Sequence, residues 1–419
     1  MKKTNFYSLA MFSLIIILGT LGKLNSQGCV AVRQMGGLNM CSANSYNLQE
    51  GDFQMGVNYR YFHSFRHFVG TDEKVFRQTT QGGFDANGVE KGNAVNIYSH
   101  ALDFNFSYGI SKRFQLNVTI PYVNNERSQV LSLKTVPGDS VFLDGKNVIQ
   151  VKEGLRYSVY AAGIGDIRIS GNYWVYDPET AHRGNLMVGL GIKLPTGRYD
   201  ATDNQVPQAN GTKLDYQVMD QAIQPGDGGL GISVELQGFK QLFGNFYGFA
   251  NGYYMFNPRE TNGAYKSSPD LIVKDPRDSK AEPHANLDTL FGNNRYASPD
   301  QFFVRAGLMT TVLNNLSISL AVRSEGIPAN DVFGGQNAYR RPGYVVSIEP
   351  GIAYRLGNHN FSLYVPKNII RNRVQSHNDI ATQEIQATVK PDVHVQGDAA
   401  FADYSISFGY TYRFNNHKM

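Results

Sequence analysis

The chain has 419 residues, of which 18% are charged and 12% are aromatic, and it contains 43 Gly, 25 Tyr and 25 Phe. Apart from the N-terminus it has no run of about 18 apolar residues, which excludes transmembrane helices. The formal net charge of +4 is too small to favour a nucleic-acid partner. Many Gly, Tyr and Phe with a mildly negative mean hydropathy suit a β-barrel that is apolar outside and polar inside.

The first 26 residues are expected to be a cleaved signal peptide. Lys2 and Lys3 supply its positive start, Leu9–Leu21 supplies its apolar segment, and small and polar residues lead to a cleavage site near Ser26. The apolar segment is shorter than the stretch of about 20 residues that a retained membrane anchor needs. The sequence therefore predicts export through the inner membrane.

Residues 27–50 are expected to form an N-terminal periplasmic segment that either plugs the barrel or carries a disulfide that only protects the terminus from proteolysis. They contain Cys29 and Cys41, the only cysteines of the chain, and in an oxidising compartment a disulfide is the economical interpretation. No His or third Cys lies nearby at metal-ligand spacing. A lipoprotein site at Cys29 is disfavoured because Ser26-Gln27-Gly28 lacks the usual aliphatic residue.

From residue 51 to 414 the chain alternates between apolar and polar residues in about twelve segments. Because successive side chains of a strand point to opposite faces, this pattern predicts strands with one lipid-facing side and one lumenal side. The expected strands are Asp52–Phe62, Ile97–Ile110, Phe114–Tyr122, Ile164–Tyr176, Leu186–Lys193, Leu230–Gln237, Phe246–Phe256, Phe302–Thr311, Leu316–Arg323, Val346–Arg355, Phe361–Val365 and Tyr404–Phe414.

The joins between these segments alternate in length. Those after the even strands are short, and those after the odd strands run to roughly twenty to forty residues, as short periplasmic turns and long extracellular loops do. The predicted fold class is all-β: a transmembrane antiparallel up-and-down β-barrel of about twelve strands. A soluble sandwich or solenoid would alternate as well, but it would not explain the signal peptide or the loop asymmetry.

The last predicted strand ends in alternate aromatic residues. Tyr410, Tyr412 and Phe414 occupy one face, and residues 415–419 follow as a short tail. This ending resembles the signal that the barrel assembly machinery of the outer membrane reads. We therefore expect these three residues to act as an assembly signal, and we expect contact with outer-membrane lipid and lipopolysaccharide.

Eleven charged residues are expected to face the lumen by strand parity. They admit two interpretations: an ion-pair network that holds the barrel in shape, or a pore lining that favours anions. The first is favoured for most of them. The candidates are Arg60, Asp103, Asp166, Arg168, Lys193, Glu235, Arg305, Arg323, Glu349, Arg355 and Arg413.

The patterns that would indicate an enzyme or a bound cofactor are weak. His63-Ser64 and Ser99-His100 are adjacent pairs, so their side chains point to opposite faces of a strand, and Asp392-Val393-His394 has no second carboxylate pair. The glycines of Gly226–Gly231 match the dinucleotide pattern but precede a strand instead of a helix. We expect no catalytic residue, no cofactor and no enzyme activity.

A metal site is the weaker interpretation of one acidic loop. Asp200, Asp203 and Asp227 lie in the same long join, and their carboxylates could bind a hard cation. Solvated loop carboxylates are the favoured alternative.

Three glycine-rich stretches carry a family resemblance. They read GIGDIRISGNYW, GLGIKLPTGRYDATD and QPGDGGLG between Gly163 and Gly231, and SEGIPANDVFGG, RRPGYVVSIEP and IIRNRVQS follow. The chain resembles the outer-membrane barrel family labelled MetA-pathway of phenol degradation, whose members are described as transporters. The resemblance implies distant kinship with the long-chain fatty-acid transporters of the outer membrane, which have an N-terminal plug but fourteen strands.

The sequence therefore favours passive uptake or export of a small solute, hydrophobic solutes included, across the outer membrane of a Gram-negative envelope. The rival interpretation is a closed barrel that serves as a structural or accessory subunit of an outer-membrane protein complex with other envelope proteins. A twelve-stranded barrel has a narrow lumen, so a wide general porin is not expected.

Overall fold

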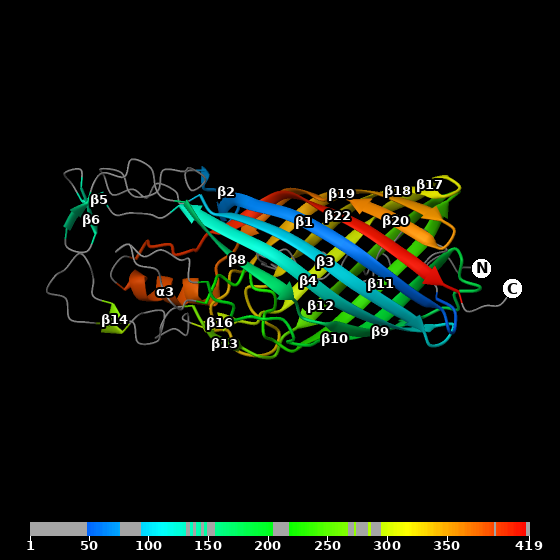
Figure 1. Cartoon of the computed structure of the whole chain (residues 1–419), viewed down its shortest axis with the longest axis horizontal. Helices are drawn as coiled ribbons and strands as arrows, with labels where there is room; N and C mark the ends of the chain where they lie inside the picture. The colour runs from blue at the N-terminus through cyan, green and yellow to red at the C-terminus, as the bar shows by residue number, and fades with distance from the viewer. Residues whose placement is uncertain are drawn as a thin grey trace.

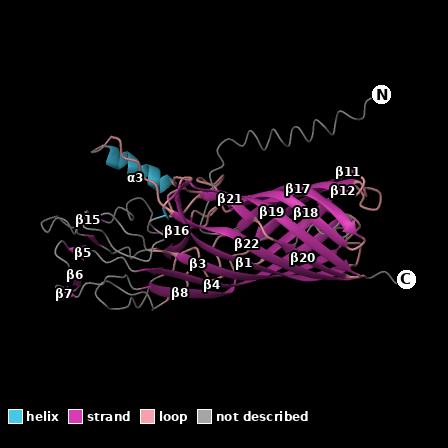
Figure 2. Cartoon of the chain, turned by 90° about the horizontal axis from the view of Figure 1, so that it is seen from above, coloured by secondary structure: helices cyan, strands magenta, loops and turns pink. Residues whose placement is uncertain are grey.

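The computed structural model describes residues 48–75, 94–130, 156–203, 218–266, 295–388 and 391–415, together with five short strands in the loops between them. Among these residues no helix is long and apolar enough to cross a membrane. The predicted disulfide between Cys29 and Cys41 and the signal peptide lie outside the described residues. Figure 1 shows a single barrel, and Figure 2 shows that its strands are inclined to the long axis.

The barrel wall is one antiparallel sheet in which sequential strands are neighbours, and β1 pairs with β22 to close it. This confirms the predicted up-and-down barrel with twelve positions around the wall. Closure leaves no free edge, so the backbone groups of the wall are paired within the sheet. The wall strands are β1 (Phe53–Val69), β3 (Asn96–Gly109), β4 (Phe114–Val130), β8 (Arg156–Ile164), β9 (Arg168–Trp174), β10 (Gly184–Lys193), β11 (Gly231–Phe243), β12 (Phe246–Phe256), β17 (Gln301–Leu313), β18 (Leu316–Ile327), β19 (Gly343–Leu356), β20 (His359–Tyr364), β21 (Lys367–Arg373) and β22 (Ala399–Phe414).

Two predicted strands cover only part of their wall positions: the fourth corresponds to β9 and the eleventh to β20, and the sequence did not predict β8 or β21. The fourth position consists of β8 and β9, which both pair with β4 and are separated at residues 165–167. The eleventh consists of β20 and β21, which both pair with β19 and are separated at residues 365–366. Gly165 lies at the first break and Pro366 at the second. Proline has no backbone N–H, so it cannot donate a hydrogen bond to the neighbouring strand.

The two faces of the wall differ in polarity as predicted. Outward residues such as Leu190, Leu236 and Leu320 are 66%, 46% and 57% exposed. Inward polar residues of the same three strands, such as Lys193, Glu235 and Arg323, are buried. Large exposed aliphatic side chains on a closed barrel are typical of a wall that faces lipid. The barrel is therefore a membrane-spanning one.

The long and short joins alternate around the barrel as expected. Short turns join β3 to β4, β11 to β12, β17 to β18 and β19 to β20, at the end where β1 begins and β22 ends. The long joins lie at the other end, and one of them contains α3 (His377–Ala387), which the sequence did not predict. Figure 2 shows α3 beyond that end of the barrel.

Smaller strands occur within the long joins. β2 (Asp72–Glu73) extends the hairpin of β1, and β13 (Thr261–Tyr265) pairs with β16 (Arg295–Ala297). The remaining short strands are β5 (Thr135–Val136), β6 (Ser140–Leu143), β7 (Lys146–Val148), β14 (Ile272–Val273) and β15 (His284–Ala285).

Candidate functional site

A belt of buried charges crosses the middle of the lumen, and we call it the lumenal girdle. Its members come from β1, β3, β9, β11, β17, β18 and β19, and none is more than 7% exposed. Isolated buried charges would be costly, so each needs a partner of opposite charge. The girdle consists of Arg60, Asp103, Arg168, Glu235, Arg305, Arg323, Glu325 and Glu349.

Glu349 is the centre of the girdle. Its Oε1 accepts a hydrogen bond of 2.7 Å from Nη1 of Arg305, and its Oε2 accepts one of 3.0 Å from Nη1 of Arg323. Arg323 also donates to Glu325 at 2.8 Å. On the opposite wall Arg168 pairs with Glu235. Four arginines and four carboxylates make the girdle electroneutral, which supports the ion-pair interpretation over an anion-selective lining.

Aromatic rings separate the ion pairs of the girdle. The guanidinium carbons of Arg168, Arg323 and Arg305 lie 4.6, 5.0 and 5.1 Å from the ring centroids of Tyr253, Phe303 and Tyr364. Such stacking is favourable for a cation above a ring face. Tyr253 is itself buried, at 6% exposure, beside Arg168.

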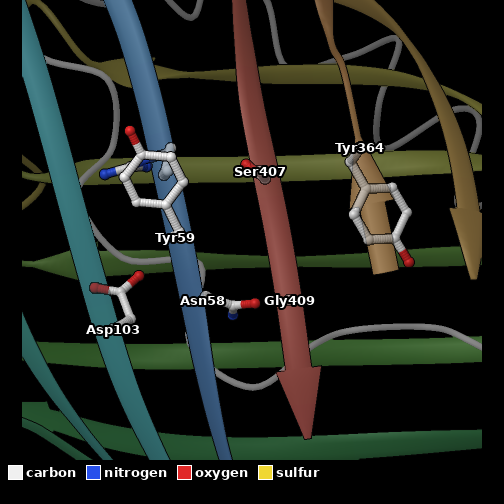
Figure 3. A pocket seen from close by; sticks show the side chains of 7 residues that line it. Asn58, Tyr59, Asp103, Tyr364, Ser407 and Gly409 are labelled. Atoms are coloured by element: carbon white, nitrogen blue, oxygen red, sulfur yellow. The ribbon is translucent and has the colours of Figure 1, made fainter. Parts of the chain in front are cut away.

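A small polar pocket adjoins the girdle at Arg60 and Asp103. Figure 3 shows its lining side chains on β1, β3, β22 and β20. Oδ1 of Asp103 and Oγ of Ser407 are buried there without a hydrogen-bond partner among the described residues. The pocket has room for about one water molecule.

Below the girdle, toward the short turns, the lumen is lined by apolar side chains, which we call the inner apolar cluster. Parity places them inward, because their neighbours Leu186, Val188 and Leu308 are exposed on the outside. They are all buried and include three aromatic rings. A water-filled porin would place polar residues here. The cluster consists of Trp174, Met187, Phe239, Phe249, Met309 and Ala321, with Tyr247 packed against it.

Above the girdle a loop folds into the lumen and packs against the inner wall, and we call residues 219–224 the mouth plug. Ile223 of the plug is fully buried, and its carbonyl accepts a hydrogen bond of 3.0 Å from Asn125 on the inner face of β4. The plug packs in one apolar cluster with inward residues of the wall, among them Ile97, Val159 and Phe401. An apolar cluster thus lies on each side of the girdle, among buried polar side chains of the wall such as Ser107, Asn172 and Ser362.

Ion pairs hold the plug to the wall at Asp220. This carboxylate accepts a hydrogen bond from Arg341 and lies 3.5 Å from Nε of Arg127. Burial alone would raise the pKa of Asp220, but the two guanidinium groups outweigh burial and hold the pKa well below its ordinary value. Asp220 therefore stays ionised at every physiological pH.

The three glycine-rich stretches singled out in the sequence meet at the base of the plug. Lys193 pairs with Asp227 and lies 3.6 Å from Oδ2 of Asp166. The Asp166 carboxylate in turn accepts hydrogen bonds of 2.9 and 3.0 Å from the N–H groups of Gly197 and Asp227. A Cβ on Gly226 would stand 2.5 Å from the carbonyl oxygen of Gly197, so only glycine allows this backbone approach. We call Asp166, Lys193 and Asp227 the rim cluster.

The predicted site residues divide into three groups. Arg60, Asp103, Arg168, Glu235, Arg305, Arg323 and Glu349 lie together in the girdle, and Asp166 and Lys193 lie in the rim cluster. Arg413 pairs with Asp52 at the turn end of the barrel. Arg355 is exposed beside the β19–β20 turn and donates to the Gly357 carbonyl at 3.2 Å, so it does not join the girdle.

The weak metal candidates are separated. Asp227 is paired with Lys193, Asp200 lies 3.4 Å from Nε of Arg198, and Asp203 accepts from the N–H of Tyr160 at 3.3 Å. In the part of the chain that the structure describes, no group of three or more His, Cys, Asp or Glu side chains is arranged to hold a metal ion.

In the adjacent His and Ser pairs, His63, Ser99 and His100 each form a hydrogen bond to a side chain of a neighbouring strand or its flank. His100 Nδ1 lies 2.8 Å from the Tyr59 hydroxyl, and His63 Nε2 lies 2.8 Å from Oδ1 of Asn96. Ser99 donates to Oδ1 of Asn125 at 2.7 Å.

Sequence reasoning missed Glu325, the mouth plug and the inner apolar cluster. Glu325 lies two residues beyond Arg323 on the same strand face, so strand parity could have found it. Inward apolar residues break the expected alternation, and only the aromatic residues on both faces of β12 hinted at them.

No protein-family model matches the chain, and no curated protein matches it. Among solved structures it is similar to the COG4313 outer membrane channel from Pseudomonas putida F1, with 9% identity and a TM-score of 0.48 over 88% of this chain and 98% of that one. It is also similar to the P. putida toluene transporter TodX (11% identity, TM-score 0.39, 89% and 92% covered) and to a Pseudomonas aeruginosa FadL homologue (9%, 0.35, 88% and 91%). We base the function on the geometry of the chain itself.

Proposed function

We propose that the chain is an outer-membrane channel for the passive passage of a small solute of low polarity. The observation that carries this proposal is the apolar cluster that lies on each side of an electroneutral girdle. Ions gain nothing from these clusters, whereas an apolar solute can transfer from one apolar cluster to the other. The girdle and the mouth plug then act as the barrier that the solute must pass.

The test measures solute entry into cells of a Gram-negative host, whose lipopolysaccharide leaflet slows apolar solutes. Cells that make the chain should take up a neutral naphthalene-type fluorophore several-fold faster than cells without it. A sulfonated analogue of similar size should enter no faster.

The matched variants are Met309→Arg and Met309→Leu. Met309 is 4% exposed in the inner apolar cluster, so the arginine places a charge in the apolar path and should abolish the extra uptake, whereas leucine should preserve it. Equal uptake by both variants at equal amounts of heat-modifiable barrel would rule out this path.

The rival function is a closed accessory subunit, and one observation favours it. Arg305, Arg323 and Glu349 are each 1% exposed, so the middle of the lumen is densely filled. If the chain is a closed accessory subunit, cells that make it, or either Met309 variant, should take up both fluorophores no faster than cells without it. The barrel should then co-purify with another envelope protein.

An outer-membrane channel must be exported across the inner membrane and then assembled into the outer membrane. The signal peptide of residues 1–26 would be removed on export, and Tyr410, Tyr412 and Phe414 would serve as the assembly signal. Support comes from β22, which pairs with β1 over almost its whole length and closes the wall. Phe414→Ser should reduce the amount of assembled barrel without reducing export to the periplasm.

A further inference from the structure

The extracellular loop between β18 and β19 exposes two adjacent apolar side chains. Val332 is 57% exposed and Phe333 is 58% exposed, in the stretch Asp331-Val332-Phe333-Gly334-Gly335. The proposed passage of a solute uses neither of them, because they lie outside both apolar clusters of the lumen. Exposed apolar side chains on an otherwise polar loop indicate an interaction surface when the backbone holds them in place.

The backbone of this loop is held by buried polar groups. Asp331 and Arg340 form an ion pair of 2.7 Å in which neither side chain is exposed. Asp300, which is fully buried, accepts a hydrogen bond of 2.9 Å from the N–H of Val332 and donates its own N–H to Asp331 at 2.9 Å. Gly334 has a φ of +100°, which reverses the chain directly after Phe333. The two apolar side chains are therefore displayed at the tip of an anchored turn.

The tip lies on the outer face of the barrel. The ring of Phe333 packs 5.6 Å from the ring of Phe256, and Phe256 points outward because its neighbour Met255 is buried inside. Phe302 of the adjacent strand also has outward parity and yet is only 9% exposed. A loop laid over the outer face at this level accounts for the burial of Phe302.

The level of the tip follows from strand geometry. β12 runs from Phe246, beside the turn at the inner end, to Phe256. Ten residues span about 33 Å along a strand, or about 25 Å along the axis of a tilted barrel, which equals the height of the apolar band of such barrels. Phe246 and Phe256 therefore mark the two edges of the band. Leu230 and Ile232, 48% and 46% exposed, continue the band beside Phe256.

We propose that Val332 and Phe333 form a membrane anchor that inserts into the acyl-chain edge of the outer leaflet. The occupant of this surface is lipid, because the two side chains extend the lipid-facing band without a gap. The anchor would fix the extracellular rim, and with it the start of β17, at a defined depth in the membrane.

The test places a tryptophan at the tip and measures its quenching by lipid. The chain has one Trp, Trp174, so Phe333→Trp is made in a Trp174→Phe background and reconstituted into phosphatidylcholine vesicles brominated near the headgroup end of the acyl chains. Should the background not fold, Trp174 is kept and its emission in the parent is subtracted. Leu190→Trp, on the lipid-facing wall, is the positive control, and Ile380→Trp on α3 is the negative control.

We expect the brominated lipid to quench Phe333→Trp at least about half as strongly as Leu190→Trp, and Ile380→Trp much less. Quenching of Phe333→Trp no stronger than that of Ile380→Trp would overturn the proposal. A tip shielded from both brominated lipid and aqueous acrylamide would overturn it as well, because a second copy or another protein would then cover the surface.

Discussion

Glu349 shows how a single residue holds the lumen together, because two arginines depend on it. Replacing it by Ala leaves Arg305 and Arg323 buried at 1% exposure beside each other, with Glu325 as the nearest remaining carboxylate. Breaking a buried ion pair from one side costs about 3–5 kcal/mol, so we expect the free energy of unfolding to fall by about that amount. Urea unfolding in lipid vesicles measures it.

The matched control for this variant is Arg355→Ala. Arg355 is exposed beside a turn, and an exposed charge of this kind contributes about 0–1 kcal/mol. If Glu349→Ala and Arg355→Ala are equally stable, the girdle does not stabilise the barrel.

Gly226 is a second residue whose type is dictated by its surroundings, because they leave no room for a side chain. A Cβ there would stand 2.5 Å from the Gly197 carbonyl oxygen and 2.6 Å from Oδ1 of Asp166. Gly226→Ala should therefore push the rim cluster apart and cost about 1–3 kcal/mol, the usual range for overpacking. Gly248→Ala is the control, because a Cβ at Gly248 meets only the flexible side chain of Leu242 at 3.7 Å. Equal melting temperatures for the two variants would contradict the close approach.

At the scale of elements, the mouth plug depends on the ionised form of Asp220. A carboxylate whose folded-state pKa is lowered contributes stability above its unfolded pKa and loses it only as the pH falls through the folded value. Arg341 and Arg127 lower the pKa of Asp220, so attachment of the plug should not change between pH 7 and about pH 5. Protection of the plug from added protease measures attachment.

Asp220→Asn should loosen the plug at every pH, because the amide keeps the shape but not the charge. The plug should then become sensitive to protease at pH 7, whereas Asp203→Asn, in the same long join but at a partly exposed position, should leave it protected. Equal protection of both variants would show that the Asp220 ion pairs do not hold the plug.

The sequence predicts strands correctly where apolar and polar side chains alternate. It does not predict where a strand is interrupted by contacts with distant parts of the chain. All twelve wall positions follow from period-two patterning, since a lipid face and a lumenal face impose it, but β8 and β21 were missed. The break between β8 and β9 does not follow, because it depends on Gly165 meeting Gly197 and the Pro225 carbonyl, which lie far away in sequence. α3 had a local signal that was overlooked: Ser376 and Asp379 form a capping box.

For the candidate site, strand parity predicts that the girdle charges face the lumen. It does not predict which arginine forms an ion pair with which carboxylate. Which arginine meets Glu349 depends on the stagger between β17, β18 and β19, and no single strand records that stagger. The position of the plug could not be predicted either, because residues 219–224 carry no strand or helix pattern. They are held by packing against the inner wall, from residues that lie far away in sequence.

At the scale of the whole molecule, the barrel holds a different group of buried side chains at each of three levels. The mouth plug packs inside the outer end, the girdle lies in the middle, and the inner apolar cluster lies toward the end where the chain enters the wall. Leu48 is 4% exposed at that end, and the Gln49 carbonyl lies against Gly109 at the first turn. The described part of the chain thus begins at the end of the barrel where the short turns lie.

Removal of Gln27 to Asn47 tests whether this segment plugs the periplasmic mouth. The peptide between Cys29 and Cys41 reads VAVRQMGGLNM and is rich in apolar residues. A disulfide across it would lower the entropy cost of ordering the loop by about 3 kcal/mol. We expect the truncated barrel to assemble, because β1 begins after the deletion, and to admit the neutral fluorophore faster than the full chain does. The Cys29→Ser variant, with the peptide intact but its ends free, should lie between the two. A truncated barrel that assembles with unchanged uptake would leave the segment no role as a plug, and its disulfide would then serve only to protect the terminus from proteolysis.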